Sequence, residues 1–273
     1  MKFISKLDIV LLTLLCILLL DSNLRLTVTE YVVSSQRLPS EFEGYKIVQL
    51  SDLHTMEFGK DNRRLVKKVA ALEPDLIALT GDYIEEAEDL PVVEALVKQL
   101  SEIAPVYFTS GNHDWASKAI RELESTVDSN GGSYLGNEHL LLERNGASII
   151  LAGVEDPNGP ADMPKPDELL ESIAAEYPDH YVILLAHRND FPIRYPDLDC
   201  DLVFTGHGHG GVIRLPLVGG LVGTDLKLFP TYDAGLFPSG RYQMVVSRGL
   251  GGAPFYPRLL NNPEIVTVTL HTK

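Results

Sequence analysis

Short apolar runs rich in β-branched residues alternate with amphipathic stretches of helical length along most of the chain. This alternation predicts an α/β fold rather than an all-β sandwich. The runs that predict strands are Tyr45–Leu50, Asp75–Thr80, Pro105–Ser110, Ala147–Ala152, Tyr181–Ala186, Leu202–Thr205, Tyr242–Ser247 and Glu264–Leu270. The stretches that predict helices are Asp61–Leu72, Leu90–Ile103, Trp115–Ser129 and Pro166–Tyr177. Few helices separate the late strands, which favours a mixed sheet, or two sheets packed face to face with helices outside.

A separate apolar run, Ile9–Leu20, lies near the N-terminus and is interrupted only by Thr13. Its length resembles the apolar part of a signal peptide more than a full membrane span, which needs about 20 residues. Three interpretations stay open: an uncleaved membrane anchor, a cleaved signal peptide and a buried core helix. We favour the anchor because no small-x-small cleavage motif follows the run. Lys2 and Lys6 precede it, so the positive-inside rule places the rest of the chain on the extracytoplasmic side of a membrane.

The chain divides into three predicted parts. We expect residues 1–23 to form a single-pass signal anchor and residues 24–43, which are polar and include Pro39, to form a connector. From residue 44 to residue 273 no linker rich in Pro, Gly or Ser and no internal repeat interrupts the sequence. That stretch is therefore predicted to be one domain, and solenoid and propeller folds are excluded.

Charge and cysteine content exclude several classes of function. The chain has 23 Lys and Arg against 38 Asp and Glu, for a net charge of −15. A protein of this charge is not expected to grip nucleic acid through its phosphates. Its two cysteines, Cys16 and Cys200, cannot build a disulfide framework or a cysteine zinc site. Any metal must use nitrogen and oxygen ligands.

Five of the predicted strands end in a short polar or glycine-containing segment that carries a possible metal ligand. Five of the eight histidines lie in these segments. The segments are Ser51-Asp52-Leu53-His54, Gly81-Asp82, Gly111-Asn112-His113-Asp114, Ala186-His187 and Gly206-His207-Gly208-His209. Because parallel strands carry their carboxyl ends to one edge of a sheet, we expect these side chains to converge.

Such a cluster predicts a metal site. Imidazole, carboxylate and amide ligands without thiolate suit Mn, Fe, Zn or Ni, and about seven ligands are too many for one tetrahedral ion. We therefore expect two ions that share a bridging ligand. The glycines before the ligands allow tight turns and a close approach of the backbone.

Each segment taken alone has a plainer interpretation. His187 after a buried strand could be a hydrogen-bonded core histidine, and Asn112 or Asp114 could cap a helix. Gly81-Asp82 is ordinary turn chemistry. The segment with His207 and His209 is the most specific, because two imidazoles among glycines have no packing role. All five together, in order, favour the metal site.

The five segments resemble the pattern of the calcineurin-like metallophosphoesterase superfamily: Asp-x-His, Gly-Asp, Gly-Asn-His-Asp/Glu, an isolated His and Gly-His-x-His. The resemblance covers about residues 45–270. Its outer parts, Val246–Gly251 and Asn262–Ile265, look like a bacterial membrane-associated branch similar to phosphodiesterases with UDP-2,3-diacylglucosamine pyrophosphatase-like activity. One departure is Ala186–Asp190, where that branch usually reads Ser-His-Asn-Pro-Asp, which puts the neighbouring loop in doubt. We expect the superfamily's four-layer α/β/β/α sandwich of two mixed sheets.

The resemblance also implies roles for these residues. Two divalent ions, Mn, Fe or Zn, would activate a bridging water for in-line attack on phosphorus. His113 would protonate the leaving oxygen or stabilise its charge, with Asp114 orienting it. The implied ligands of one ion are Asp52, His54, Asp82 and His209, and those of the other are Asp82, Asn112, His187 and His207.

The substrate is inferred less directly. Arg188 follows a ligand and is the candidate for holding a phosphate, although it could equally be a surface charge. Residues 212–229 are apolar and could form a lip that accepts a lipid tail, but we favour a buried hairpin. The sequence thus predicts a membrane-tethered hydrolase of a phosphodiester or pyrophosphate, with a lipid-linked or cell-envelope substrate. The alternatives are an enzyme acting on soluble nucleotides or wall polymers, an inactive scaffold and a structural metal protein.

Overall fold

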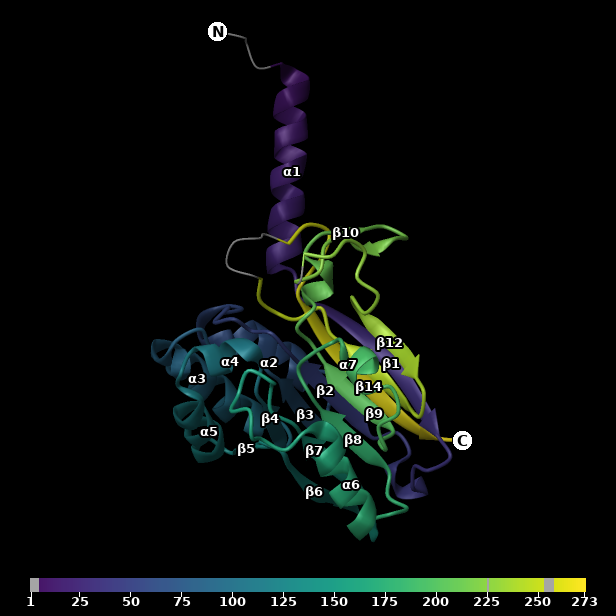
Figure 1. The fold of residues 1–273 in the computed structure, drawn as a ribbon. Coiled ribbons are helices and arrows are strands. Elements are labelled where there is room, and N and C mark those ends of the chain that lie inside the picture. The colour runs from purple at the N-terminus through teal and green to yellow at the C-terminus, as the bar shows by residue number, and fades with distance from the viewer. Residues whose placement is uncertain (1–4, 225, 253–257) are drawn as a thin grey trace.

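Two mixed β-sheets form the centre of the protein in a computed structural model that describes residues 5–224, 226–252 and 258–273 (Figure 1). In spatial order, the first sheet contains β1 (Thr27–Ser35), β14 (Glu264–Thr272), β2 (Lys46–Leu50), β3 (Leu76–Thr80), β4 (Val106–Thr109) and β5 (Gly132–Tyr134). The second contains β12 (Gly235–Ser239), β13 (Tyr242–Val246), β9 (Leu202–Thr205), β8 (Val182–Leu185), β7 (Ala147–Gly153) and β6 (Glu138–Arg144). A small pair, β10 (Arg214–Leu215) and β11 (Gly219–Gly220), lies apart from both.

Parallel pairing brings the ends of the central strands together. In the first sheet β2, β3, β4 and β5 run parallel, and β14 pairs antiparallel with β2. In the second sheet β13, β9, β8 and β7 run parallel, with antiparallel β12 and β6 at the edges. The carboxyl ends of the central strands of each sheet therefore lie at a common edge.

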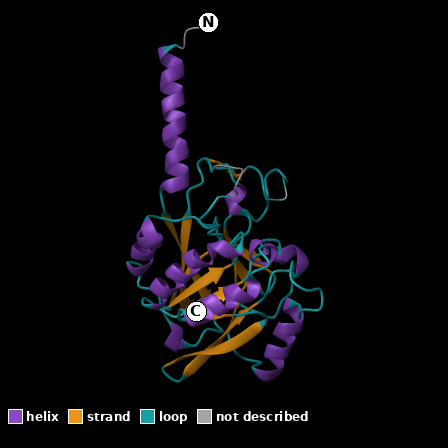
Figure 2. Ribbon diagram, turned by 90° about the vertical axis from the view of Figure 1, so that its left-hand side faces the viewer, coloured by secondary structure: helices purple, strands orange, loops and turns teal. Residues whose placement is uncertain are grey.

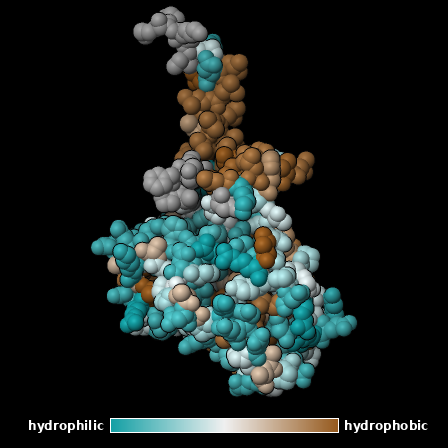
Figure 3. All heavy atoms as spheres, in the orientation of Figure 1, coloured by the Kyte–Doolittle hydropathy of each residue, from teal (hydrophilic) through white to brown (hydrophobic). Residues whose placement is uncertain are grey.

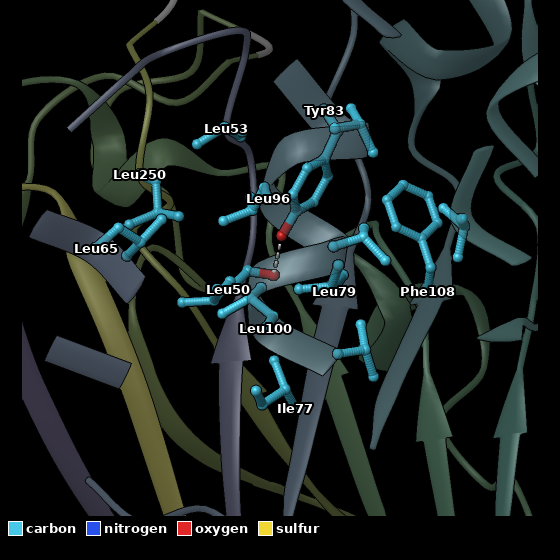
Figure 4. Packing of buried hydrophobic residues seen from close by; sticks show 14 of the residues in the cluster. Leu50, Leu53, Leu65, Ile77, Leu79, Tyr83, Leu96, Leu100, Phe108 and Leu250 are labelled. Atoms are coloured by element: carbon cyan, nitrogen blue, oxygen red, sulfur yellow. Dashed lines mark hydrogen bonds between the residues drawn. The ribbon is translucent and has the colours of Figure 1, made fainter. Parts of the chain in front are cut away.

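Helices cover the outer face of each sheet, and three apolar clusters join the layers. The helices are α1 (Lys6–Leu24), α2 (Arg63–Ala70), α3 (Leu90–Ser101), α4 (Asn112–Ala116), α5 (Ile120–Ser129), α6 (Pro166–Glu176) and α7 (Phe191–Arg194). One cluster packs α2, α3 and α5 against the first sheet; it includes Leu65 of α2 and Leu96 of α3, and the Tyr83 hydroxyl within it donates to the Leu50 carbonyl (Figure 4). The second cluster lies between the sheets, and the third lies between the second sheet and α6. The expected four-layer α/β/β/α arrangement is confirmed.

Local differences from the sequence-based expectation have physical causes. The predicted helix Trp115–Ser129 is two helices, α4 and α5, because Lys118 adopts a positive φ of 61° between them. The strands β5, β6 and β12 were not expected, because they lie at or next to sheet edges and their alternating or short apolar patterns are weak.

The interpretation of residues 24–43 as a polar connector is wrong for most of that segment. Residues 27–35 form β1, which pairs in parallel with β14 along nine residues. Val33 and Leu38 are buried in the cluster between the sheets. Their polar neighbours face outward at the edge of the sheet. Because buried and outward-facing residues alternate, the segment was interpreted as polar and the strand was not predicted.

The N-terminal helix α1 projects from the rest of the protein (Figures 1 and 2). It has 19 residues, a mean hydropathy of 2.1 over its most apolar part and almost entirely exposed side chains, so it is long and apolar enough to cross a membrane. Its last turn contacts the domain: Ser22 Oγ accepts from Leu260 N, and Asn23 exchanges two hydrogen bonds with the backbone of Arg258. These contacts make the end of α1 part of the fold. Residues 1–4, which include Lys2, lie outside the described residues.

The segment 212–229 departs from the buried hairpin that we favoured. It contains the short pair β10 and β11, but its large apolar side chains are exposed. Leu217 is fully exposed, and Leu226 and Phe229 are 72% and 56% exposed. This segment lies at the base of α1 (Figure 1).

Candidate metal centre

The residues expected to bind metals converge where the two sheets meet. Asp52 and His54 follow β2, Asp82 follows β3 and Asn112 begins α4 directly after β4. On the second sheet, His187 follows β8, and His207 and His209 follow β9. The expected ligands thus come from neighbouring strand ends, as parallel pairing requires.

The ligand atoms form two groups. Asp52, His54 and His209 place one ligand atom each within 4.8 Å of one another, and so do Asp82, His187 and His207. Asp82 Oδ2 lies 3.0 Å from His187 Nε2 and 3.7 Å from His54 Nε2, so this carboxylate stands between the groups. Two metal positions with Asp82 as the shared ligand fit this arrangement.

Hydrogen bonds orient the groups for metal binding. His187 Nδ1 donates to the Thr80 carbonyl at 2.9 Å, which turns Nε2 toward Asp82. The backbone N–H groups of His113 and His207 donate to the carboxylates of Asp82 and Asp52 at 2.8 and 2.9 Å. These contacts fix each ligand in the way that a metal site requires.

Two buried atoms at the site also fit a cation. Asn112 Oδ1 is buried without a hydrogen-bond partner among the described residues, and His187 Nε2 is buried against the Asp82 carboxylate. Burial opposes a charge on His187, yet the Asp82 carboxylate raises the pKa of this imidazole to about 10. A positive charge is therefore strongly favoured between these two side chains, and a divalent cation supplies one.

The protonation states of the remaining ligands suit coordination. Burial lowers the pKa values of His207 and His209 well below the usual range of histidine, so both imidazoles are neutral and keep a lone pair. Burial would raise the pKa of Asp82, but the positive charges of His187 and His54 outweigh it and hold that pKa below its usual range. Asp82 is therefore ionised.

The backbone is strained at most of the ligands. Asp52, His54, Asp82, His207 and His209 all have positive φ values, from 45° to 61°. Side chains other than glycine rarely adopt this region, at a cost on the order of 1 kcal/mol or more each. Positive φ values also occur at other residues, such as Asn62 and Lys118, but strained backbone at these five residues is in keeping with a functional site, where the surrounding structure holds side chains in place.

Glycine is required where the two loops touch. Gly111 has an ordinary extended conformation (φ −112°, ψ −178°), but a Cβ on it would overlap the Asp82 carboxylate and the Asp82 backbone nitrogen. The contact gives the glycine at this position a role in the close approach of the backbone to Asp82.

Replacing Gly111 with alanine is therefore expected to displace Asp82 and reduce metal content from two ions per chain to about one or fewer. Metal analysis of the purified protein measures this. Gly146 lies at a turn with open space around it, so Gly146→Ala is the control and should keep its metals despite a φ of +88°. Full metal content in Gly111→Ala would contradict the assigned position of Asp82.

Glu85, rather than Asp114, is the carboxylate that contacts His113. Glu85 Oε2 lies 2.7 Å from His113 Nδ1, and its other oxygen lies 2.6 Å from His54 Nδ1. The Glu85 hydrogen bond is the main cause of the raised pKa of His113. Sequence reasoning missed Glu85; the available signal was a carboxylate three residues after Asp82 in the same loop.

The expected role of Asp114 as the residue that orients His113 is therefore corrected. Its buried carboxylate accepts hydrogen bonds from the backbone N–H groups of four residues. The donors are Asp82, Tyr83, Ile84 and Gly111. From the first turn of α4, the side chain of Asp114 thus holds together the two loops that carry Asp82 and Asn112.

Arg188 lies at the site and is held by a partner that the sequence did not reveal. Its Nε and one terminal nitrogen donate to Asp156 at 2.6 and 3.0 Å, and its other terminal nitrogen lies 3.2 Å from His207 Nε2. The two-point pairing aims the guanidinium at the ligand cluster. Arg188 is therefore positioned to contact an anion bound there.

A cavity of about 610 Å³ opens over the ligands. Its lining has a polar part and an apolar part, which we call the polar wall and the apolar wall. The polar wall includes His54, Asp82, Asn112, His113, Arg188, His207 and His209. The apolar wall includes Val212, Ile213, Val222 and Leu226. The cavity can thus hold a molecule with an anionic centre and an apolar part.

Known proteins are similar to this chain in sequence. The family model described as calcineurin-like phosphoesterase matches residues 45–211. The chain is 29% identical to the uncharacterized metallophosphoesterase YkuE of Bacillus subtilis over 89% of this chain and 84% of that protein. It is 29% identical to phosphodiesterase YaeI of Escherichia coli (83% and 82%) and 27% identical to UDP-2,3-diacylglucosamine pyrophosphatase LpxG of Chlamydia muridarum (84% and 85%). The chain belongs to the calcineurin-like phosphoesterase family and is a phosphoester hydrolase.

Proposed function

We propose that this protein hydrolyses a phosphodiester or pyrophosphate with two divalent metal ions, on a lipid-linked or cell-envelope substrate at a membrane. The observation that carries the proposal is the pair of ligand groups joined by Asp82. Bound there, two ions such as Mn, Fe or Zn supply an activated water and neutralise the phosphoryl oxygens. Asp52, His54, Asp82 and His209 would hold one ion, and Asp82, Asn112, His187 and His207 would hold the other.

The protein's own side chains perform the remaining tasks. Arg188, fixed by Asp156, contacts an oxygen of the substrate phosphate. His113 lines the cavity and is free at Nε2 to give a proton to the leaving oxygen, while Glu85 holds Nδ1. The raised pKa of His113 favours the protonated form that this role needs.

His113→Ala is expected to retain both metals and to lower kcat by about 100-fold to 10,000-fold, because the proton donor is lost. The loss should be largest for substrates with poor leaving groups, which need the proton most. Rates for a series of diesters with different leaving groups, together with metal analysis, measure this. An unchanged rate for a poor leaving group would rule out the acid role of His113.

Two observations support a membrane substrate. α1 is long and apolar enough to cross a bilayer, and apolar side chains line the same cavity as the expected metal ligands. LpxG, named for a pyrophosphatase that acts on a diacylated sugar nucleotide, aligns with most of the chain. An uncleaved α1 with Lys6 on the cytoplasmic side would place the catalytic domain on the extracytoplasmic side.

The testing experiment compares two substrates with the full chain in detergent micelles and added Mn. One is a small water-soluble diester, and the other is a lipid-linked sugar-nucleotide pyrophosphate. Much higher kcat/KM for the lipid supports the proposal. Equal or exclusive turnover of the soluble diester would contradict the lipid substrate and favour a general phosphodiesterase, and no turnover with two bound metals would favour an inactive scaffold.

A further inference from the structure

An exposed apolar surface lies between α1 and the metal cavity. We name it the apolar lip, and it consists of Leu215, Leu217, Val218, Leu226, Leu228 and Phe229. Each of these side chains is at least 38% exposed. Figure 3 shows the brown surface of α1 continuing into a brown projection at its base, above a largely hydrophilic domain. A soluble surface rarely gathers so many large apolar side chains without a partner.

The dimensions of α1 indicate what covers the lip. Nineteen residues of helix extend about 28 Å, close to the roughly 30 Å of a bilayer's hydrocarbon core. If α1 spans the bilayer, its whole length is needed to cross the hydrocarbon core, so its last turn must lie at the bilayer surface. That turn contains the exposed ion pair between Asp21 and Arg25, whose charges suit the headgroup layer.

The lip is next to this last turn. Leu18, Asp21 and Arg25 line a surface cavity together with residues 214–219 of the lip segment. The short hydrogen-bonded contact between Leu260 and Ser22 joins the same region to the domain. If α1 spans a bilayer, the lip must therefore meet the bilayer surface as well.

The lip is held in a defined position. Arg214 at its base pairs with Asp233 at 2.9 Å and donates to the Gly210 carbonyl. Asp233 also accepts from the backbone of Gly220, and Asn261 donates to the carbonyl of Val212. These hydrogen bonds hold the backbone of the segment in a conformation that leaves the side chains of the lip exposed.

Residues of the same segment, 212–229, form the apolar wall of the metal cavity. Val212, Ile213, Val222 and Leu226 line that cavity, and Leu226 is also part of the lip. Residues 212–229 are thus a loop segment that lies between the bilayer surface and the expected metal ligands.

We propose that the apolar lip inserts into the bilayer surface and delivers the apolar part of a membrane lipid directly to the metal cavity. This inference rests on the proposed function, because it requires a spanning α1 and a phosphate-bearing lipid as substrate. The occupant of the lip is the lipid bilayer rather than a second protein.

Depth of insertion is measured on the full chain in phospholipid vesicles. Leu217→Cys, in a Cys16→Ala background, is labelled with an environment-sensitive fluorophore, and brominated lipids are used as quenchers. Glu143→Cys is the control, because it is exposed on β6 at the end of the domain far from α1 (Figure 1). We expect a several-fold greater quenching at position 217 than at position 143. Equal quenching at both positions in protein that floats with the vesicles would overturn the proposal.

Turnover gives a second, independent readout. Leu217→Glu combined with Val218→Glu should raise KM for the vesicle-borne lipid substrate at least 10-fold and leave kcat/KM for the soluble diester unchanged, because neither residue lines the metal cavity. Leu141→Glu, at an exposed apolar position on β6, is the matched control and should change neither. An unchanged KM for the lipid substrate in the double variant would overturn the proposed role of the apolar lip.

The outcomes separate this inference from the proposed function. Lipid turnover with no quenching at position 217 would refute the lip alone. Strong quenching without hydrolysis of any phosphoester would refute the proposed function but retain the membrane contact. Protection of position 217 that depends on protein concentration rather than on brominated lipid would identify a second copy of the chain as the occupant and overturn the proposal.

Discussion

Asp82→Ala is expected to abolish phosphoester hydrolysis, with a fall in kcat of at least about 1,000-fold. The reason is the position of its carboxylate, within 3.0 Å of His187 Nε2 and 3.7 Å of His54 Nε2, between the two ligand groups. Its loss would remove the proposed shared ligand from both proposed metal positions and leave His187 without the carboxylate that raises its pKa. We expect metal content to fall from two ions per chain to one or none, measured by elemental analysis beside the rate.

The control is a partly buried carboxylate that lies away from the proposed metal cluster. Asp201 precedes β9, whereas His207 and His209 follow that strand, and Asp201 accepts a hydrogen bond from Val182 N. Asp201→Asn should therefore keep both metals and most of the activity, even if stability decreases. Two ions per chain in Asp82→Ala would contradict its role as the shared ligand.

The convergence of the expected ligands could be predicted because these residues follow strand ends closely. For Asp82 or His187 the only tertiary information needed is that parallel strands place their carboxyl ends together. Because the loops after parallel strands meet at this edge, Gly111 could also be expected to allow a close approach of the backbone there. The expected strands agree with β2, β3, β4, β8 and β9 within about two residues at each end.

The residues that support the ligands could not be predicted in this way. Glu85 and Asp156 act on His113 and Arg188 through contacts that only the folded loops create. Asp114 illustrates the same limit: it is adjacent to His113 in sequence, but its side chain points to the backbone of the Asp82 loop. Adjacency in sequence predicted a contact that the first turn of α4 does not allow.

The N-terminal segment is connected to the metal centre through the C-terminal part of the chain. Asn23 binds the backbone of Arg258, and the buried guanidinium of Arg258 donates to the carbonyls of Gly251 and Arg248. Gly251 N in turn donates to the Asp52 carbonyl, and Asn261 donates to the His209 carbonyl. A helix expected to be a separate anchor therefore ends on the segment that supports two metal ligands.

A chain that begins at residue 41 is consequently expected to lose most of its stability, although residues 44–273 read as one domain in the sequence. It lacks β1, and with it the buried side chains of Leu26, Val33 and Leu38. Burial of such side chains contributes about 1.5–3 kcal/mol each, so the loss is comparable to the whole net stability of a domain, about 5–15 kcal/mol. Removal of β1 also exposes the unpaired edge of β14, which favours aggregation.

A chain that begins at Arg25 tests whether the strand or the helix matters more. It keeps β1 and loses α1 together with the hydrogen bonds that Asp21, Ser22, Asn23 and Leu24 make with the domain, each worth about 1 kcal/mol. We expect this smaller truncation, which removes residues 1–24, to lower Tm by several degrees and to leave a soluble protein that binds two metals. Thermal unfolding and metal analysis of the two truncated chains measure the difference. A chain from residue 41 as stable as the chain from Arg25 would show that β1 is dispensable, because only β1 and the short segment after it distinguish the two.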